Sequence, residues 1–71
     1  MLENEFYLAL DEEIITDDLL HKLKRVFKSY PGESLVNLKI IGRSESFKVL
    51  QLKKIKVNPN LSFLYDVISE L

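Results

Sequence analysis

The stretch from Thr16 to Gly32, TDDLLHKLKRVFKSYPG, decides the fold because it holds one complete amphipathic helix with its start and stop signals. Its apolar residues recur with the i, i+1, i+4, i+7, i+8, i+11 spacing of a single helical stripe. They are Leu19, Leu20, Leu23, Val26, Phe27 and Tyr30. The opposite face is basic, so this pattern predicts a surface helix that buries one side.

The ends of this helix are also marked in the sequence. The Thr16 hydroxyl is placed to cap the helix by accepting a hydrogen bond from the free amide of Asp18 or Leu19. Pro31 disfavours helical geometry at the residue before it, so the helix is expected to end near Ser29.

On both sides of the helix, apolar residues alternate with polar ones, which is the period of a β-strand. Strands are predicted at about 5–10, 36–40 and 47–57. The phase of the alternation slips between Leu50 and Lys54, which indicates a bulge or a break. The third strand is therefore either bulged or split in two.

A second helix is predicted after the third strand, with Asn58 as its cap and Pro59 at its first position, where a missing amide costs nothing. The stripe expected to face the core is Leu61, Leu64, Tyr65, Ile68 and Leu71. Phe63 and Val67 lie off that stripe, so the apolar surface covers more of the helix than one contact needs.

These elements give the order βαββα, an α+β fold of two layers. A right-handed crossover makes the first two strands parallel, and an antiparallel third strand then fits between them or at the outer edge. We expect a mixed sheet of three strands, or four if the third is split, with both helices on one face. At 71 residues, the segment 1–71 is predicted to be a single domain.

The sequence shows no catalytic, metal-binding or cofactor-binding pattern. The only acidic cluster, Asp11 to Asp18, falls in a turn and a first helical turn, where solvated and capping acids are common. His21 lies among lysines without a neighbouring serine, and two glycines cannot form a glycine-rich phosphate loop. We therefore expect this segment to act by binding rather than by catalysis, without metal or cofactor.

Charge is distributed unevenly along the chain. Residues 1–21 hold seven acids and no Lys or Arg, whereas residues 22–56 hold all ten bases and two acids, a local net charge of +8. This basic middle is either a solvated surface or a nucleic-acid contact. The candidate nucleic-acid contacts are Lys22, Arg25, Lys28, Lys53, Lys54 and Lys56. Single-strand binding also needs exposed aromatic rings, and the strand pattern places Phe47 in the core, which leaves mainly Tyr7.

The longest apolar run, Phe6 to Leu10, is far shorter than the roughly 20 residues of a membrane-spanning helix. The residues before it are acidic, unlike the basic start of a secretion signal. These features, with the absence of cysteine, predict a cytoplasmic protein that does not enter a membrane.

The surplus apolar surface of the last helix has two interpretations. It is either a partner-binding surface formed by Phe63, Val67 and Leu71, or a set of large side chains that a small core needs for volume.

Several segments together resemble the C-terminal domain of the bacterial replicative DNA polymerase III alpha subunit. In that family a leucine-rich helix runs into a Pro-Gly turn, a V.L.I strand follows, and a strand ending in Val leads to a final leucine-rich helix. The matching segments are Leu19–Leu20, Leu23–Lys24, Val26–Phe27, Tyr30–Ser34, Val36–Ile40 and Ile55–Pro59. The resemblance spans about Phe6 to Leu71.

The resemblance implies a docking role in DNA replication. Domains of this family follow an oligonucleotide-binding fold and help attach the polymerase to the tau subunit of the clamp loader, among other holoenzyme subunits. The whole protein is then a DNA-directed DNA polymerase, a nucleotidyltransferase whose catalytic aspartates lie in other domains. The alternatives are a nucleic-acid-binding module that uses the basic residues 22–56, or a regulatory module unrelated to replication. The isolated domain is expected to be monomeric, with at most weak DNA contact.

Overall fold

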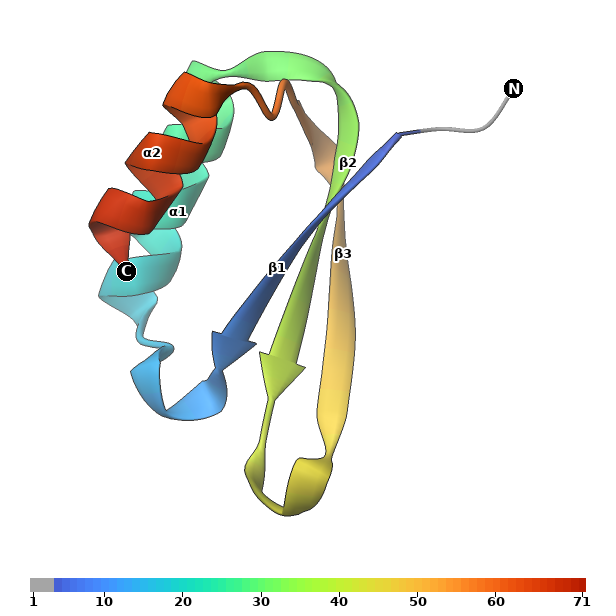
Figure 1. Cartoon of the computed structure of the whole chain (residues 1–71), viewed down its shortest axis with the longest axis vertical. Helices are drawn as coiled ribbons and strands as arrows, with labels where there is room; N and C mark the ends of the chain where they lie inside the picture. Colours follow the sequence, from blue (N-terminus) through green and yellow to red (C-terminus); the bar gives the residue numbers. More distant parts are fainter. Residues whose placement is uncertain (1–3) are drawn as a thin grey trace.

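The computed structural model describes residues 4–71, without the side chain of Glu45. Three strands form one sheet in the order β1-β2-β3: β1 (Glu5–Asp11), β2 (Pro31–Ile41) and β3 (Phe47–Val57). β1 runs parallel to β2, and β3 runs antiparallel to it at the outer edge. The helices α1 (Asp17–Ser29) and α2 (Leu61–Glu70) lie side by side on one face of the sheet (Figure 1). The predicted α+β fold with two layers and a mixed sheet of three strands is confirmed. The oligonucleotide-binding fold that the family resemblance implies is not observed in residues 4–71, because that fold is a barrel of five strands and this sheet is open and has three.

Helix α1 forms where its pattern predicts. The Thr16 hydroxyl accepts a hydrogen bond from the Leu19 amide at 3.1 Å, and the helix ends at Ser29. Leu19, Leu23 and Phe27 are buried against the sheet. Because α1 has a single apolar stripe, only this side of the helix can pack against the sheet, as it does in the structure.

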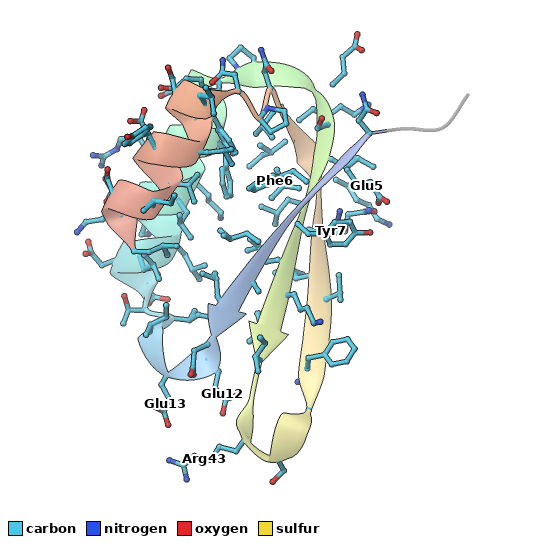
Figure 2. All side chains as sticks on the ribbon, in the orientation of Figure 1. Glu5, Phe6, Tyr7, Glu12, Glu13 and Arg43 are labelled. Atoms are coloured by element: carbon cyan, nitrogen blue, oxygen red, sulfur yellow. The ribbon has the colours of Figure 1, made fainter. Side chains whose placement is uncertain are left out.

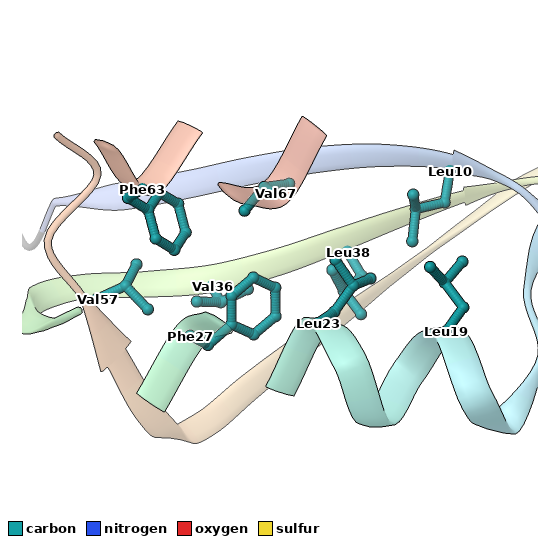
Figure 3. Close-up of a cluster of buried hydrophobic side chains, with 9 residues drawn as sticks. All are labelled: Leu10, Leu19, Leu23, Phe27, Val36, Leu38, Val57, Phe63 and Val67. Carbon is teal, nitrogen blue, oxygen red and sulfur yellow. The ribbon is translucent and has the colours of Figure 1, made fainter. Parts of the chain in front are cut away.

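The core lies between the sheet and the two helices (Figure 3). Phe6, Leu8 and Leu10 of β1 lie directly beside residues 36, 38 and 40 of β2, so their side chains share the face that the helices cover. The buried members of this core are Leu10, Leu19, Leu23, Phe27, Val36, Leu38, Val57, Phe63 and Val67. Side chains of the other parity, such as Tyr7, lie on the uncovered face of the sheet (Figure 2).

Strand β3 contains the irregularity that the sequence indicates, within one continuous strand. Leu35 pairs with Lys56 while the next residue, Val36, pairs with Leu52, so residues 53–55 are extra on β3. Three extra residues reverse the parity of the strand. Val57 is therefore buried, whereas Phe47 is turned to the uncovered face and is 58% exposed. The prediction that Phe47 lies in the core is wrong for this reason.

The start of β2 and the end of β3 approach each other closely at Gly32. A Cβ atom at this position would lie 2.6 Å from backbone atoms of Val57 and Asn58. The start of β2 thus passes against the end of β3 at a distance that only glycine permits. This contact fixes the point from which the chain enters α2.

Helix α2 buries a different side from the one predicted. Phe63 and Val67 are buried in the core, and the residues expected to face the core point outward. The Phe63 ring lies 5.0 Å from the Phe6 ring, 5.9 Å from the Phe27 ring and 5.6 Å from the Tyr30 ring, measured between centroids. A buried aromatic side chain with three aromatic neighbours contributes more apolar contact than a leucine in the same place. This packing explains why the side of α2 with Phe63 and Val67 is buried, although it holds fewer apolar residues than the other.

The cap of α2 also differs from the prediction. The Asn60 side chain accepts a hydrogen bond from the Phe63 amide at 2.8 Å, so Asn60 is the cap and the helix begins at Leu61. Asn58 and Pro59 precede the helix. Both asparagines are suitable caps, and the position of Phe63 in the core selects the second.

Candidate functional site

A row of exposed apolar side chains lies on one side of α2. Four large apolar side chains lie there at positions i, i+3, i+7 and i+10: Leu61, Leu64, Ile68 and Leu71. We call these four residues the apolar flank. Leu61 is 78% exposed, Ile68 is 68% exposed and Leu71 is 53% exposed. Tyr65, next to them on the helix, is also exposed.

The apolar flank points away from α1. The Tyr30 hydroxyl at the end of α1 donates a hydrogen bond to the Asp66 carboxylate at 2.5 Å, so the Asp66 side of α2 faces α1. Leu64 and Ile68 each lie two residues from Asp66, which at about 100° per residue places them on the opposite side. Because α1 contacts β3 and Phe63 of α2 contacts Phe6 of β1, this opposite side lies toward the β1 edge of the sheet.

The structure separates the three predicted partner-binding residues. Leu71 belongs to the exposed flank, whereas Phe63 and Val67 are fully or almost fully buried. A partner cannot reach Phe63 or Val67 while α2 stays packed on the sheet. The predicted surplus of apolar surface on this helix is real, but it lies on the residues that the pattern assigned to the core.

The predicted nucleic-acid contacts fall on α1 and β3. Lys28 lies between two shallow hollows, one of about 370 Å³ shared with Arg25 and one of about 230 Å³ shared with Lys54 and Lys56. Lys22 forms an ion pair with Asp18 at 3.2 Å, and Lys53 is an exposed residue of the β3 bulge that lines neither hollow. Four of the six predicted bases therefore form a continuous basic surface centred on Lys28.

The uncovered face of the sheet carries a polar network that the sequence did not indicate. The Glu5 carboxylate accepts hydrogen bonds from Tyr7 at 3.1 Å, Gln51 at 3.2 Å and Asn37 at 3.5 Å, and Gln51 also donates to Asn37 at 3.1 Å. Residues from three strands meet here because Asn37 pairs with both Tyr7 and Gln51 across the sheet. The hydrogen bond to Glu5, and then the charge of that carboxylate, raise the pKa of the Tyr7 phenol.

Two exposed aromatic rings lie on this face. The Lys39 ammonium lies 4.5 Å from the centre of the Phe47 ring, a cation–π contact, and Tyr7 is also exposed. The sequence left mainly Tyr7 as a candidate for stacking on nucleic-acid bases, so Phe47 is an addition from the structure. The phase reversal in β3 was the only signal that could have indicated it.

Two residues of the acidic cluster make local contacts. Glu13 forms an ion pair with Arg43 at 3.5 Å (Figure 2). The Asp11 side chain caps the short helix Glu12–Ile14 by accepting a hydrogen bond from the Glu13 amide. Within residues 4–71, no three His, Cys, Asp or Glu side chains are close enough to hold a metal ion. Glu3, one of the seven acids in residues 1–21, lies outside the described residues.

Among the described residues, neither helix has the length and apolar character needed to cross a membrane.

Comparison with known proteins gave no match. No protein-family profile, no curated protein and no solved structure is significantly similar to this chain.

Proposed function

We propose that this chain is a non-catalytic protein-docking domain. In the specific form that its sequence resemblance suggests, it helps attach a bacterial replicative DNA polymerase, through its alpha subunit, to the clamp-loader tau subunit during DNA replication in the cytoplasm. Polymerase activity in such a protein resides in domains other than this one.

The apolar flank of α2 is the observation that carries this proposal. A domain of this size buries only about 60% of the surface that its unfolded chain exposes, so it needs most of its large apolar side chains inside. Complete burial of one such side chain contributes about 1.5–3 kcal/mol. Four of them aligned on one side of a helix form a contiguous apolar surface of the kind that marks a protein interface.

Binding of the isolated chain to the tau subunit, measured by calorimetry, tests the proposal. Ile68→Lys should weaken binding about 10- to 100-fold, because it replaces a central apolar contact by a charge. The matched control is Ser69→Lys, which adds the same charge to the next exposed residue of the helix. Both variants should keep the circular dichroism and stability of the original chain.

The outcomes separate the parts of the proposal. Equal binding by Ile68→Lys and the original chain would show that the apolar flank is not part of the interface. No binding of the original chain to tau would reject the polymerase assignment.

A second candidate function, nucleic-acid binding, is favoured by the basic surface around Lys28. The structure brings this side chain close to Arg25 on one side and to Lys54 and Lys56 on the other, although they come from different elements. Bases that follow one continuous surface can track a phosphate backbone.

Titration of a labelled single strand at several salt concentrations tests this second function. Binding should weaken steeply with salt, and Lys28→Ala should lower both the affinity and the salt dependence, by about one released counterion. Lys48→Ala, an exposed lysine of β3 outside both hollows, is the control. Absence of binding at low salt would reject this function.

A further inference from the structure

The two edges of the sheet differ in how well they are protected from pairing with another strand. β3 carries four lysines and the extra residues 53–55, and both lysines and bulges discourage the addition of a further strand. β1 is regular, alternates between the two faces and contains no lysine, proline or bulge. Among residues 4–71 no strand lies beyond β1.

The backbone of β1 turns half of its polar groups toward this edge. The Leu35 amide donates to the Asn4 carbonyl at 2.9 Å, so Asn4 directs its backbone toward β2. Successive residues of an extended strand direct their amide and carbonyl groups to opposite edges. Glu5, Tyr7, Ala9 and Asp11 therefore present theirs at the free edge, as a template for one more strand.

The apolar flank of α2 lies toward the same edge, because α2 packs over β1 with its Asp66 side toward α1. A strand added beside β1 would extend the sheet beneath this flank. Its side chains on the helix-covered face would then meet Leu64 and Ile68, which now lie partly or largely in water. One partner segment would satisfy the free backbone groups and the exposed apolar side chains together.

The charges at this edge indicate what the segment carries. β1 has Glu5 and Asp11 on its uncovered face and no base, and the apolar flank of α2 carries no base either. Two copies of the chain meeting edge to edge would bring acidic surfaces together, which is unfavourable. A segment with Lys or Arg on alternate residues would instead place its positive charges beside Glu5 and Asp11.

We propose that the free edge of β1 and the apolar flank of α2 form one docking site for an extended basic segment of a partner protein. The segment adds as a fourth strand, with its basic side chains on the uncovered face and its apolar side chains beneath α2. This mode is β-strand addition, in which the main chain gives affinity and alternate side chains give specificity. The inference rests on the proposed docking function and names the chemistry of the partner.

The test uses a defined probe, the acetylated and amidated peptide Lys-Val-Lys-Ile-Lys-Val-Lys, titrated into the intact chain and followed by nuclear magnetic resonance. Its length matches the 7 residues of β1. On binding, the outward amides of Tyr7 and Ala9 should exchange about tenfold more slowly with solvent, while the inward amide of Leu8 should change little. The same peptide with Glu in place of Lys should bind about tenfold more weakly or not at all.

Variants locate the site on the chain. Ala9→Pro removes an outward amide from an edge strand, a position where proline is compatible with the sheet, and should weaken peptide binding about tenfold. Ala9→Val keeps the amide and should bind the peptide within about twofold of the original chain. Ile68→Lys should also weaken binding, and Ser69→Lys should not.

Each contrary result overturns a stated part. No protection of Tyr7 and Ala9 by the peptide rejects strand addition, and this measurement on the original chain stands even if Ala9→Pro does not fold. Equal binding of the Glu peptide rejects a basic partner. Protection that grows with protein concentration without peptide would identify a second copy as the occupant instead. If the original chain does not bind the peptide but binds tau in a way that depends on Ile68, this inference is rejected and the proposed function stands.

Discussion

Helices α1 and α2 lie side by side on the same sheet, but they use their apolar residues differently. α1 has one apolar stripe, which is buried, and its remaining residues are mostly charged. α2 has apolar residues on two sides; it buries Phe63 and Val67 and leaves its larger stripe exposed. The first helix is therefore explained by folding alone, whereas the second has apolar surface that folding does not use.

The largest expected effect comes from comparing substitutions on the two sides of α2. Phe63→Ala should lower the free energy of unfolding by about 3–5 kcal/mol, because it removes a buried ring with three aromatic neighbours. Leu61→Ala, on the exposed side, should change it by no more than about 0.5 kcal/mol. Urea denaturation followed by circular dichroism measures both. Similar losses in the two variants would mean that the helix does not have the described orientation.

A smaller effect is expected at the caps of the two helices. Thr16→Ala and Asn60→Ala each remove a side-chain acceptor from a helix start and should cost about 1 kcal/mol in denaturant unfolding. Asn58→Ala, two residues before the second cap, should cost clearly less. A larger loss of stability in Asn58→Ala than in Asn60→Ala would show that α2 begins where the sequence predicted.

The smallest expected effect concerns the hydrogen bond that joins the helices. The bond to Asp66, with burial and the carboxylate charge, raises the pKa of Tyr30 above its ordinary value of 10.0. A group with a raised pKa in the folded state stabilises that state fully below its unfolded pKa and loses the contribution as pH rises through the folded one. Stability should thus fall above pH 10, and Tyr30→Phe should reduce that fall.

The difference between Tyr30→Phe and the original chain is the quantity to measure, because it cancels every other effect of high pH that the two proteins share. Thermal unfolding at a series of pH values from 8 to about 11.5 provides it. Parallel stability curves for the two proteins over that range would contradict a contribution from this hydrogen bond.

The same contrast explains what the sequence could predict. The stripe of α1, the Thr16 cap and the alternation in β1 and in residues 36–40 of β2 each permit one arrangement, and the structure has it. β2 begins earlier than its alternation predicts, at Pro31, where the chain pairs with the end of β3. The parity of Phe47 depended on how many extra residues β3 accommodates, which only pairing with β2 decides. The orientation of α2 depended on whether a leucine stripe or Phe63 fits between Phe6, Phe27 and Tyr30, which is a property of the packed core.

The candidate site followed from the sequence only in part. The surplus of apolar residues on α2 was visible in its pattern, but the buried and exposed stripes were exchanged. The basic residues of α1 and β3 were identified, although their meeting around Lys28 requires the sheet order. The free edge of β1 could not be assigned, because the sequence did not determine which of the other two strands a β3 at the outer edge lies beside.

The most direct measurement for this account is the access of a soluble paramagnetic compound to the side chains of α2, read from nuclear magnetic resonance signals of the folded chain. We predict strong attenuation of the methyl signals of Leu61 and Ile68 and almost none for Val67 and the ring of Phe63. Attenuation of Phe63 and Val67 with protection of Leu61 and Ile68 would contradict the exposed apolar flank on which the docking proposals depend.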